Sequence, residues 1–337
     1  MRPNVRWRLI DPVVLATFVV ASCSSPTEPG PSIMEGTIRL QAQVRDLAYD
    51  QQRNLLYLAV PTGFRVDVLS LSTLQLASPV STGPNRPSAL DLSPGGDSLI
   101  VTLPEARAVG IIVLDPRRLI DTVRLDSFPD FGLRRPDVIR VLANSHAITV
   151  TTQESIGFDG LVVDYNLSAR TVRWRQDVGY NFTVTSNTYV ARSGDRKRLL
   201  MLLADTCCPT WAFVYNSDTD AFSRKVDTVD DSYPSISANV DGSRFLIGAT
   251  LFSGTLEFLQ EYQPSRYAGG PTTLNPDGAS GFFATPDGVV QIRLSDGAVL
   301  RSFTTGTPPT ALYALPTGRA LVVVTPSTLS VFRLGAV

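Results

Sequence analysis

Residues 87–101, with the sequence PSALDLSPGGDSLIV, contain the unit that decides the fold. A proline approach leads into an alternating apolar run, a glycine-bearing turn follows, and a second apolar run completes the unit. Close copies lie at residues 234–248 (PSISANVDGSRFLIG), 271–284 (PTTLNPDGASGFFA) and 309–324 (PTALYALPTGRALVVV). Glycine permits the positive φ that tight hairpins require, so each copy predicts two antiparallel strands joined by a short turn.

Seven copies of this unit lie between Arg45 and Val337. A period of roughly 36 to 50 residues, with several short strands per copy, is typical of β-propeller blades, none of which can bury its apolar faces alone. Residues 33–337 allow about 43 residues for each of seven blades, whereas eight blades would be unusually short. We therefore predict an all-β protein in which residues 33–337 form a single seven-bladed β-propeller domain, although length alone would favour two domains.

The second blade illustrates how the pattern predicts its strands. We expect strands at residues 89–92, 98–102, 109–114 and 119–125. The inner strands are nearly continuous runs of Ile, Val and Leu, as is usual for strands packed on both faces. The outermost strand alternates between apolar and polar residues because one of its faces is solvated.

The two ends of the repeat region predict how the ring closes. The last repeat supplies three strands, at residues 310–315, 319–325 and 329–334. Residues 36–44 (GTIRLQAQV) alternate like an outer strand and have no blade of their own. We therefore expect this N-terminal segment to complete the final blade and to remove its open edge.

Blade five has the weakest pattern of the seven. After a strand expected at residues 255–262, the chain offers only residues 263–270 (QPSRYAGG) for the outer strand. Proline and glycine in this segment argue against a regular strand. The sequence therefore leaves the regularity of blade five open.

The first 22 residues are typical of a signal peptide. Three arginines among the first eight residues precede an apolar run at residues 13–21, which is too short to span a bilayer. The run ends in Val20-Ala21-Ser22-Cys23, which resembles the lipobox of bacterial lipoproteins. That resemblance implies that Cys23 is acylated and becomes the mature N-terminus. The alternative is ordinary secretion, in which Cys23 has no role.

Residues 23–32 are rich in Pro and Ser, a composition that stays extended and would act as a tether. We therefore expect an exported protein of the cell envelope, lipid-anchored to the outer membrane or facing the periplasm. The chain contains 30 Lys and Arg against 31 Asp and Glu, so no net field attracts polyanions and nucleic acid is excluded as a partner. We expect a monomer.

Parts of the repeat resemble a known family of exported proteins. Residues 50–59 (DQQRNLLYLA) and 66–74 (VDVLSLSTL) resemble the YVTN-type propeller repeat, which is WD-like and similar to the propeller of quinoprotein amine dehydrogenases. The asparagine that closes the family motif is missing after Ala59 and Thr102. The resemblance implies the fold, export and a binding or scaffolding role, but no reaction. In blade two, the matching residues are Gly83, Pro87, Ser93, Pro94, Gly95, Gly96, Asp97 and Asp115.

The sequence contains few residues suited to catalysis. His146 is the only histidine, and it lies in Asn144-Ser145-His146-Ala147, where other blades place a hairpin turn, so we expect it to be solvent-exposed. A single histidine excludes multi-histidine metal sites. The sequence has no haem-attachment motif, no glycine-rich phosphate loop and no paired metal carboxylates, so we predict no metal and no cofactor.

Cys207 and Cys208 are adjacent, between the second and third strands expected for blade four. In an exported chain whose Cys23 carries lipid, these two cysteines are left to pair with each other. Consecutive Cα atoms lie about 3.8 Å apart, below the usual disulfide range, so such a bridge would be strained and would stiffen its loop. The alternatives are a free or partly oxidised pair in a surface loop, and a direct role in binding.

Propeller topology predicts where a ligand would bind. Connections between second and third strands, and from each fourth strand to the next blade, emerge on one face around the channel. We call this the loop face, and loops at one end of a rigid scaffold suit recognition; the alternative is that they are ordinary solvated loops. The candidate ligand-binding residues on this face are Arg86, Glu105, Arg107, Arg134, Arg135, Glu154, Asp159, Trp211, Asp230, Asp231 and Tyr233.

Three functions are compatible with these observations. The first is a membrane-anchored propeller that binds a protein, peptide or glycan on its loop face, without catalysis. The second is a propeller enzyme of the quinoprotein-dehydrogenase or lyase type, which would require a basic pocket or a catalytic base that the sequence does not reveal. The third is a purely architectural component of the envelope.

Overall fold

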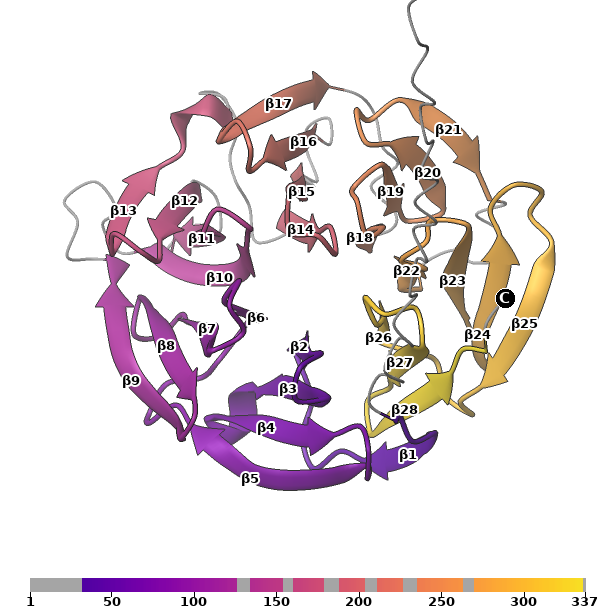
Figure 1. Cartoon of the computed structure of the whole chain (residues 1–337), viewed down its shortest axis with the longest axis horizontal. Coiled ribbons are helices and arrows are strands. Elements are labelled where there is room, and N and C mark those ends of the chain that lie inside the picture. Colours follow the sequence, from indigo (N-terminus) through magenta and orange to yellow (C-terminus); the bar gives the residue numbers. More distant parts are fainter. Residues whose placement is uncertain are drawn as a thin grey trace, which may run out of the picture. The chain divides into compact units, whose positions relative to one another are not determined.

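The computed structural model describes residues 32–125, 134–153, 160–178, 188–203, 211–226, 235–262 and 270–335. Within these ranges the strands form seven antiparallel sheets of four strands each. Figure 1 shows the seven sheets arranged as blades in a closed ring. The predicted all-β, seven-bladed propeller is therefore confirmed.

The strands of each blade follow one another outward from the channel. The innermost strands are β2 (Asp46–Asp50), β6 (Leu90–Leu92), β10 (Arg134–Val141), β14 (Thr188–Arg192), β18 (Ile236–Ala238), β22 (Thr272–Leu274) and β26 (Ala311–Ala314). The second strands are β3 (Leu55–Val60), β7 (Ser98–Leu103), β11 (His146–Gln153), β15 (Arg198–Leu203), β19 (Arg244–Ile247), β23 (Ser280–Thr285) and β27 (Ala320–Val324).

The third strands are β4 (Arg65–Ser70), β8 (Ala108–Leu114), β12 (Leu161–Asn166), β16 (Trp211–Asn216), β20 (Thr250–Ser253), β24 (Gly288–Arg293) and β28 (Thr328–Arg333). The outer strands are β5 (Gln75–Ser81), β9 (Arg117–Arg124), β13 (Thr171–Trp174), β17 (Ala221–Val226), β21 (Phe258–Glu261), β25 (Val299–Thr304) and β1 (Gly36–Arg39). Two short 3-10 turns, Pro61–Gly63 and Gln176–Val178, complete the described elements.

Burial follows the amino-acid pattern that predicted the strands. All five residues of β27 (ALVVV) are buried, and β7 (SLIVTL) is buried except for its first residue. Strand β9 (RRLIDTVR) alternates between half-buried and exposed residues after its first two positions. The sheets therefore pack face to face through their inner strands, whereas the rim of the ring is solvated.

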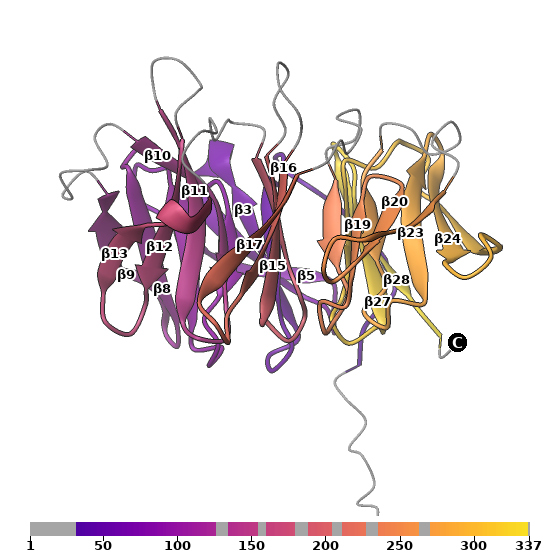
Figure 2. The ribbon, with the colours of Figure 1, turned by 90° about the horizontal axis from the view of Figure 1, so that it is seen from above.

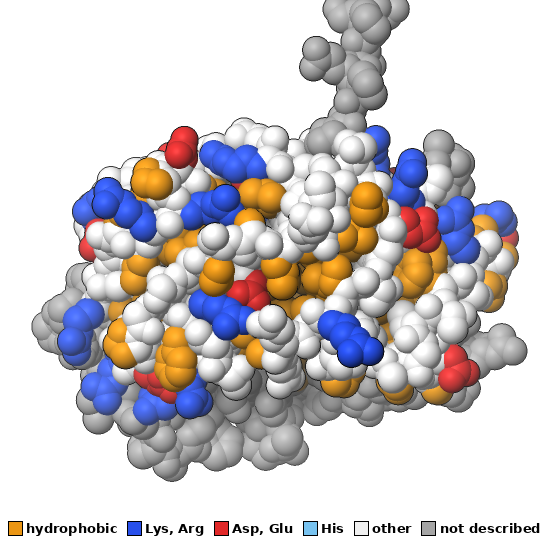
Figure 3. Space-filling view, turned by 90° about the horizontal axis from the view of Figure 1, so that it is seen from below, with side chains coloured by type: hydrophobic (Ala, Val, Ile, Leu, Met, Phe, Trp, Pro, Cys, Tyr) orange, Lys and Arg blue, Asp and Glu red, His pale blue; other side chains and the backbone are white. Residues whose placement is uncertain are grey.

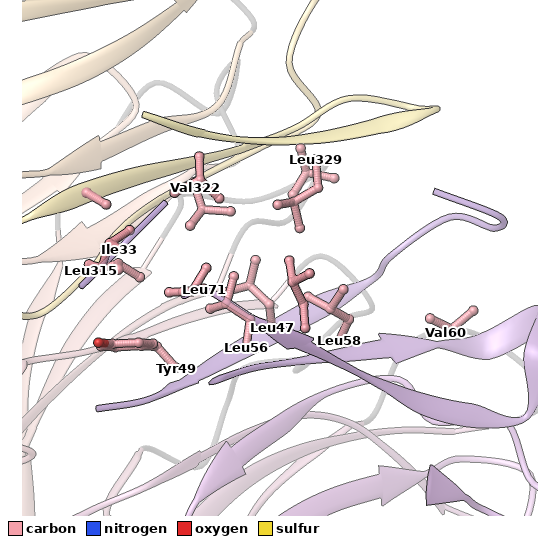
Figure 4. Packing of buried hydrophobic residues seen from close by; sticks show 14 residues of the cluster. Ile33, Leu47, Tyr49, Leu56, Leu58, Val60, Leu71, Leu315, Val322 and Leu329 are labelled. Atoms are coloured by element: carbon pink, nitrogen blue, oxygen red, sulfur yellow. The ribbon is translucent and has the colours of Figure 1, made fainter. Parts of the chain in front are cut away.

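Each of the seven interfaces between neighbouring blades contains a cluster of buried apolar side chains. Figure 4 shows the cluster between blades seven and one, where Val322 and Leu329 face Leu56 and Leu58. Ile33, which precedes the first strand, lies in the same cluster and is 7% exposed. The core is thus divided into wedges between blades, as expected for a repeat protein whose units bury apolar surface only against their neighbours.

The N-terminal strand closes the ring as predicted. The final sheet has the order β1-β28-β27-β26, and β1 runs antiparallel to β28 with Gly36 opposite Val331 and Arg39 opposite Thr328. The strand is shorter than the nine residues expected. Just before it, the Met34 amide donates to the Leu71 carbonyl of blade one at 2.7 Å, so this segment connects the first and last blades.

Blade five has four strands, and the strand expected at residues 255–262 was placed too late in the chain. Its third strand is β20, at Thr250–Ser253, and the segment Phe258–Glu261 is already the outer strand β21. A tight turn joins the two, with Leu256 at φ 64° and its amide bonded to the Ser253 carbonyl at 2.9 Å. Strands of four residues compress the blade, so residues 263–269, which lie outside the described ranges, are not needed for it.

The side of the ring that Figure 3 shows has mixed chemistry. Figure 2 shows the blades edge-on, and Figure 3, a space-filling side view, shows apolar side chains interspersed with Lys and Arg and with fewer Asp and Glu. Within the described residues, no helix is long and apolar enough to cross a membrane.

Candidate ligand-binding channel

The central channel contains two connected cavities. The outer chamber, of about 580 Å³, is lined by residues from all seven blades and lies at the end where the innermost strands begin, which is the loop face. The inner chamber, of about 230 Å³, continues toward the opposite face, where Gly194, Asn239 and Pro316 of the first turns line it. The two share Asp46, Arg140 and further lining residues, so they form one continuous hollow.

An ion pair lies where the two chambers meet. Arg140 of blade three donates to both carboxylate oxygens of Asp46 of blade one, at 2.8 and 3.2 Å. The Leu90 amide donates to the same carboxylate at 3.0 Å. Burial alone would lower the pKa of Arg140, but the Asp46 carboxylate more than offsets this and the pKa of Arg140 is raised.

A second ion pair crosses the inner chamber. Arg192 of blade four donates from Nε and Nη2 to the two oxygens of Asp91 of blade two, at 2.8 and 3.1 Å. The Val141 amide adds a hydrogen bond of 2.8 Å, so the carboxylate also contacts blade three. Burial by itself would raise the pKa of Asp91, but the nearby arginines, Arg192 foremost, hold it below its usual range.

The remaining wall of the inner chamber is mainly apolar. Val190, Ile236, Leu274 and Leu312 line it, and they come from blades four to seven. Tyr313 of blade seven lies among them and feels the charges of Arg192 and Asp91, although burial is the main reason that its pKa is raised. The inner chamber is therefore amphipathic, with its charged groups on blades one to four.

The outer chamber has balanced charges and many hydroxyl groups. Arg45 and Asp137 form an ion pair of 2.6 Å across it, and Ser88 donates to both the carbonyl and the carboxylate of Asp137. Ser235 and Thr272 hydrogen-bond to each other at 2.7 Å on the opposite side. Such a surface can donate and accept hydrogen bonds without attracting one sign of charge.

A second polar cluster lies between blades three and four, away from the channel. Arg175, whose side chain is 4% exposed, contacts Asp164, Asp177 and Asp220 at 3.3, 2.5 and 2.6 Å. Its guanidinium also lies over the rings of Tyr215 and Phe222 at 5.2 and 5.5 Å. Although burial by itself would raise the pKa of Asp220, hydrogen bonds from Arg173, Tyr215 and Arg175 hold it well below its usual range.

The expectation of a solvent-exposed His146 was wrong. His146 begins β11 and its side chain is only 15% exposed, because Nδ1 lies 2.9 Å from Asp164 and Asn166 lies 3.2 Å from Nε2. His146, Asp164 and Asp220 bring ligand atoms within 4.8 Å of one another. Arg173 and Arg175 bind the same carboxylates, so the cluster is an ion-pair network in which a metal ion would have to compete with two guanidinium groups.

The loop-face residues singled out from the sequence are only partly brought together. Arg86 and Glu105 form an exposed ion pair of 3.4 Å, and Arg86 also lies 5.5 Å from the ring of Phe64. Arg107 occupies a turn at φ 51° beside this pair. The candidates Glu154, Asp159, Asp230, Asp231 and Tyr233 lie outside the described residues, as do Cys23, Cys207 and Cys208.

The other predicted loop-face residues belong to strands. Arg134 and Arg135 are the first two residues of β10, and Trp211 is the first residue of β16. Trp211 packs against the apolar cluster between blades three and four.

The charged residues of the channel were missed by the sequence analysis. Asp91, Arg140 and Arg192 each interrupt an apolar innermost strand, in the segments ALDL, VIRV and YVAR. A charge at a position that should be buried is the signal that could have identified them, because such groups are rarely buried without a partner.

Comparisons with known proteins support the fold. No protein-family model matches the sequence, and no curated protein matches it. Among solved structures, the chain is similar to hydrazine synthase from Kuenenia stuttgartiensis, with a TM-score of 0.63 over 88% of this chain and 97% of that chain. The two share 12% sequence identity, so the likeness shows the propeller fold alone.

Proposed function

We propose that this protein is an exported, lipid-anchored binding module whose ligand enters the central channel from the loop face. The observation that carries the proposal is the outer chamber, of about 580 Å³, lined by all seven blades. Concave sites with a few placed polar groups on a rigid scaffold are the usual form of a ligand site.

The chemistry of the outer chamber favours a peptide or a glycan segment. Its charges are paired, as in Arg45 with Asp137 and Asp46 with Arg140, so it offers no excess of either sign. Its more accessible hydroxyl groups, those of the half-buried Ser235 and the exposed Thr310, can exchange hydrogen bonds with amides or sugar hydroxyls. The lipid anchor is supported by the Val20-Ala21-Ser22-Cys23 segment and the tether behind it.

A tryptophan placed in the outer chamber tests this function. Ala311 lines the chamber, is exposed and lies at the start of β26, so Ala311→Trp would occupy the hollow without disturbing the core. The control is Ala77→Trp, at an exposed position on the outer strand β5. The protein is applied to arrays of envelope peptides and glycans. Its binding to them should be lost in Ala311→Trp and retained in Ala77→Trp.

Two results would refute the proposal. One is binding that both tryptophan variants retain equally. The other is an array on which the unmodified protein binds no peptide and no glycan.

A further inference from the structure

The carboxylates of the inner chamber have little remaining capacity to accept hydrogen bonds. Asp91 accepts from Nε and Nη2 of Arg192 and from the backbone amides of Val141 and Leu92. Asp46 accepts from Nη1 and Nη2 of Arg140 and from the Leu90 amide. A carboxylate offers about four acceptor sites, so both groups are nearly saturated by the protein itself.

The donors of the same chamber are not used up. A guanidinium carries about five N–H donors, and Arg140 and Arg192 each make three hydrogen bonds within the described residues. Arg196 lies beside the chamber rather than in its lining, and within the described residues it makes one hydrogen bond, from Nη1 to the Leu92 carbonyl at 2.5 Å, and no ion pair. The Tyr313 hydroxyl makes no hydrogen bond to the described part of the chain, although it belongs to a residue lining the chamber.

The charges around the inner chamber, like its unused hydrogen-bond donors, favour a negatively charged ligand. Three guanidinium groups, of Arg140, Arg192 and Arg196, surround the two carboxylates. Arg196 lies in the first turn of blade four and reaches across to blade two, where its charge acts on Asp91 and Tyr313. Within the described residues Asp91 is paired with Arg192, and Arg196 has no carboxylate of its own. Burial lowers the pKa of Arg196, and the Asp91 carboxylate offsets this only in part.

We propose that the inner chamber binds a free carboxylate carried on a short apolar chain, with Tyr313 as the binding residue in its wall and Arg196, which lies beside that wall, supplying positive charge. The carboxylate supplies the acceptor and the negative charge that the chamber lacks, and a charge-assisted pair with a guanidinium is the strongest hydrogen bond available there. The apolar chain lies against Val190, Ile236 and Leu312. The inference rests on the proposal that the channel is a ligand site, and it adds the chemical class that the inner end recognises.

Matched acids and amides test the carboxylate requirement. Butanoate, hexanoate and octanoate are titrated into the protein beside the corresponding primary amides, with calorimetry as the readout. The acids should bind roughly tenfold or more tightly than the amides, because only they form charge-assisted hydrogen bonds. Affinity should rise roughly fourfold for each added methylene until the chamber is full. Acetyl-Gly-Leu is titrated with a free and with an amidated C-terminus. The comparison shows whether the chamber binds the terminal carboxylate of a peptide as well as that of a small acid.

Variants test whether Tyr313 and Arg196 cause the preference for acids over amides. Tyr313→Phe removes only the free hydroxyl, and Arg196→Gln removes the positive charge, so each should reduce the ratio of acid to amide affinity. Arg196→Lys should restore much of that ratio. Lys197→Gln is the matched control, because it removes the same charge one residue away from an exposed side chain. Melting temperatures of all variants identify any that fail to fold, and Tyr313→Phe remains the test if Arg196→Gln does.

Each outcome bears on one proposal. Equal affinities for acids and amides would overturn the carboxylate site. So would a ratio of acid to amide affinity that stays unchanged in both Tyr313→Phe and Arg196→Gln. Neither result would affect array binding or its loss in Ala311→Trp, on which the proposed function depends. If the protein binds the acids but no arrayed peptide or glycan, the proposed peptide or glycan ligand is overturned and the carboxylate site is retained. Ala311 lines both chambers, so Ala311→Trp should also weaken acid binding, and acids that bind this variant as tightly as wild type would place their site outside the channel.

Discussion

Arg192 and Asp91 form a bidentate ion pair between blade four and blade two, with Nε–Oδ2 and Nη2–Oδ1 distances of 2.8 and 3.1 Å. The pair connects two blades that are not neighbours in the ring. Arg140 and Asp46 connect blades three and one in the same way. Polar contacts across the channel therefore supplement the apolar clusters between neighbouring blades, so removing one partner should affect the whole domain.

Replacing Asp91 should give a pH-dependent loss of stability. The folded-state pKa of Asp91 is lowered, so its charge stabilises the protein above the unfolded pKa of about 3.9, and this contribution is lost as pH falls toward the folded value. Asp91→Asn should cost about 3–5 kcal/mol near neutral pH, because Arg192 stays buried without its partner. The difference in unfolding free energy between Asp91→Asn and wild type should become smaller as pH falls below about 4.

Urea unfolding at pH 7, 5, 4 and 3 measures this difference. Asp218→Asn is the control, because Asp218 is 64% exposed and lies 3.7 Å from Lys197, and it should change stability by less than about 0.5 kcal/mol. A deficit in Asp91→Asn that stays constant from pH 7 to pH 3 would contradict the assigned role of the charge.

Arg175 should be among the most sensitive positions outside the channel. Its buried guanidinium satisfies three carboxylates, so Arg175→Ala should destabilise the domain by about 3–5 kcal/mol, and Arg175→Lys should rescue little because an ammonium cannot reproduce the planar fork. Arg170→Ala removes an exposed pair with Asp121 and should cost less than about 1 kcal/mol. Thermal unfolding of the three variants compares them directly, and similar losses in Arg170→Ala and Arg175→Ala would argue against a buried network.

The sequence predicted the parts of the fold that depend on local patterns. Turn glycines such as Gly96, Gly242 and Gly278 have φ of 69°, 66° and 68°, so the hairpins that they predicted are present. In blade five the turn between the third and outer strands places Leu256, not glycine, at positive φ. Leu74, Arg170 and Asp220 hold the same kind of position in blades one, three and four, so glycine does not mark this turn and the strand positions beside it are weakly specified by the sequence.

The candidate site depends on relationships that no local pattern contains. Asp91 and Arg192 are separated by 101 residues, and Asp46 and Arg140 by 94. They meet only because a closed ring brings alternate blades together across the channel. The sequence can mark a charge in an apolar strand as unusual, but its partner follows only once the number of blades and the position of each strand are known.

The N-terminal strand should be required for a stable ring. Deleting residues through Val44 removes β1 and Ile33, exposes the edge of β28 and opens the apolar cluster between blades one and seven. Among contacts of the described residues, deleting through Ser32 removes the carbonyl that accepts from Asn54 and Ser72, and it should cost far less. Thermal unfolding compares the two truncations, and equal melting temperatures would remove the closure argument.

Acylation of Cys23 is expected from Val20-Ala21-Ser22-Cys23 and the tether that follows. Cys23→Ser should move the protein from the membrane fraction to the soluble fraction, because one cysteine would carry the anchor. Mass spectrometry of the mature N-terminus identifies the modification directly. A Cys23→Ser protein that still fractionates with membranes, together with an unmodified wild-type N-terminus, would show that the lipobox is not used.

Cys207 and Cys208 should form a disulfide in the exported protein. An oxidising compartment favours the bridge, and no other cysteine remains once Cys23 is acylated. The closed loop is minimal, so it removes almost no chain entropy from the unfolded state and should hardly change global stability. We expect Cys207→Ser with Cys208→Ser to leave the melting temperature nearly unchanged while weakening any ligand that contacts the loop face. Thiol counting on denatured, unreduced protein decides the matter, since two reactive thiols per chain would show that the bridge does not exist.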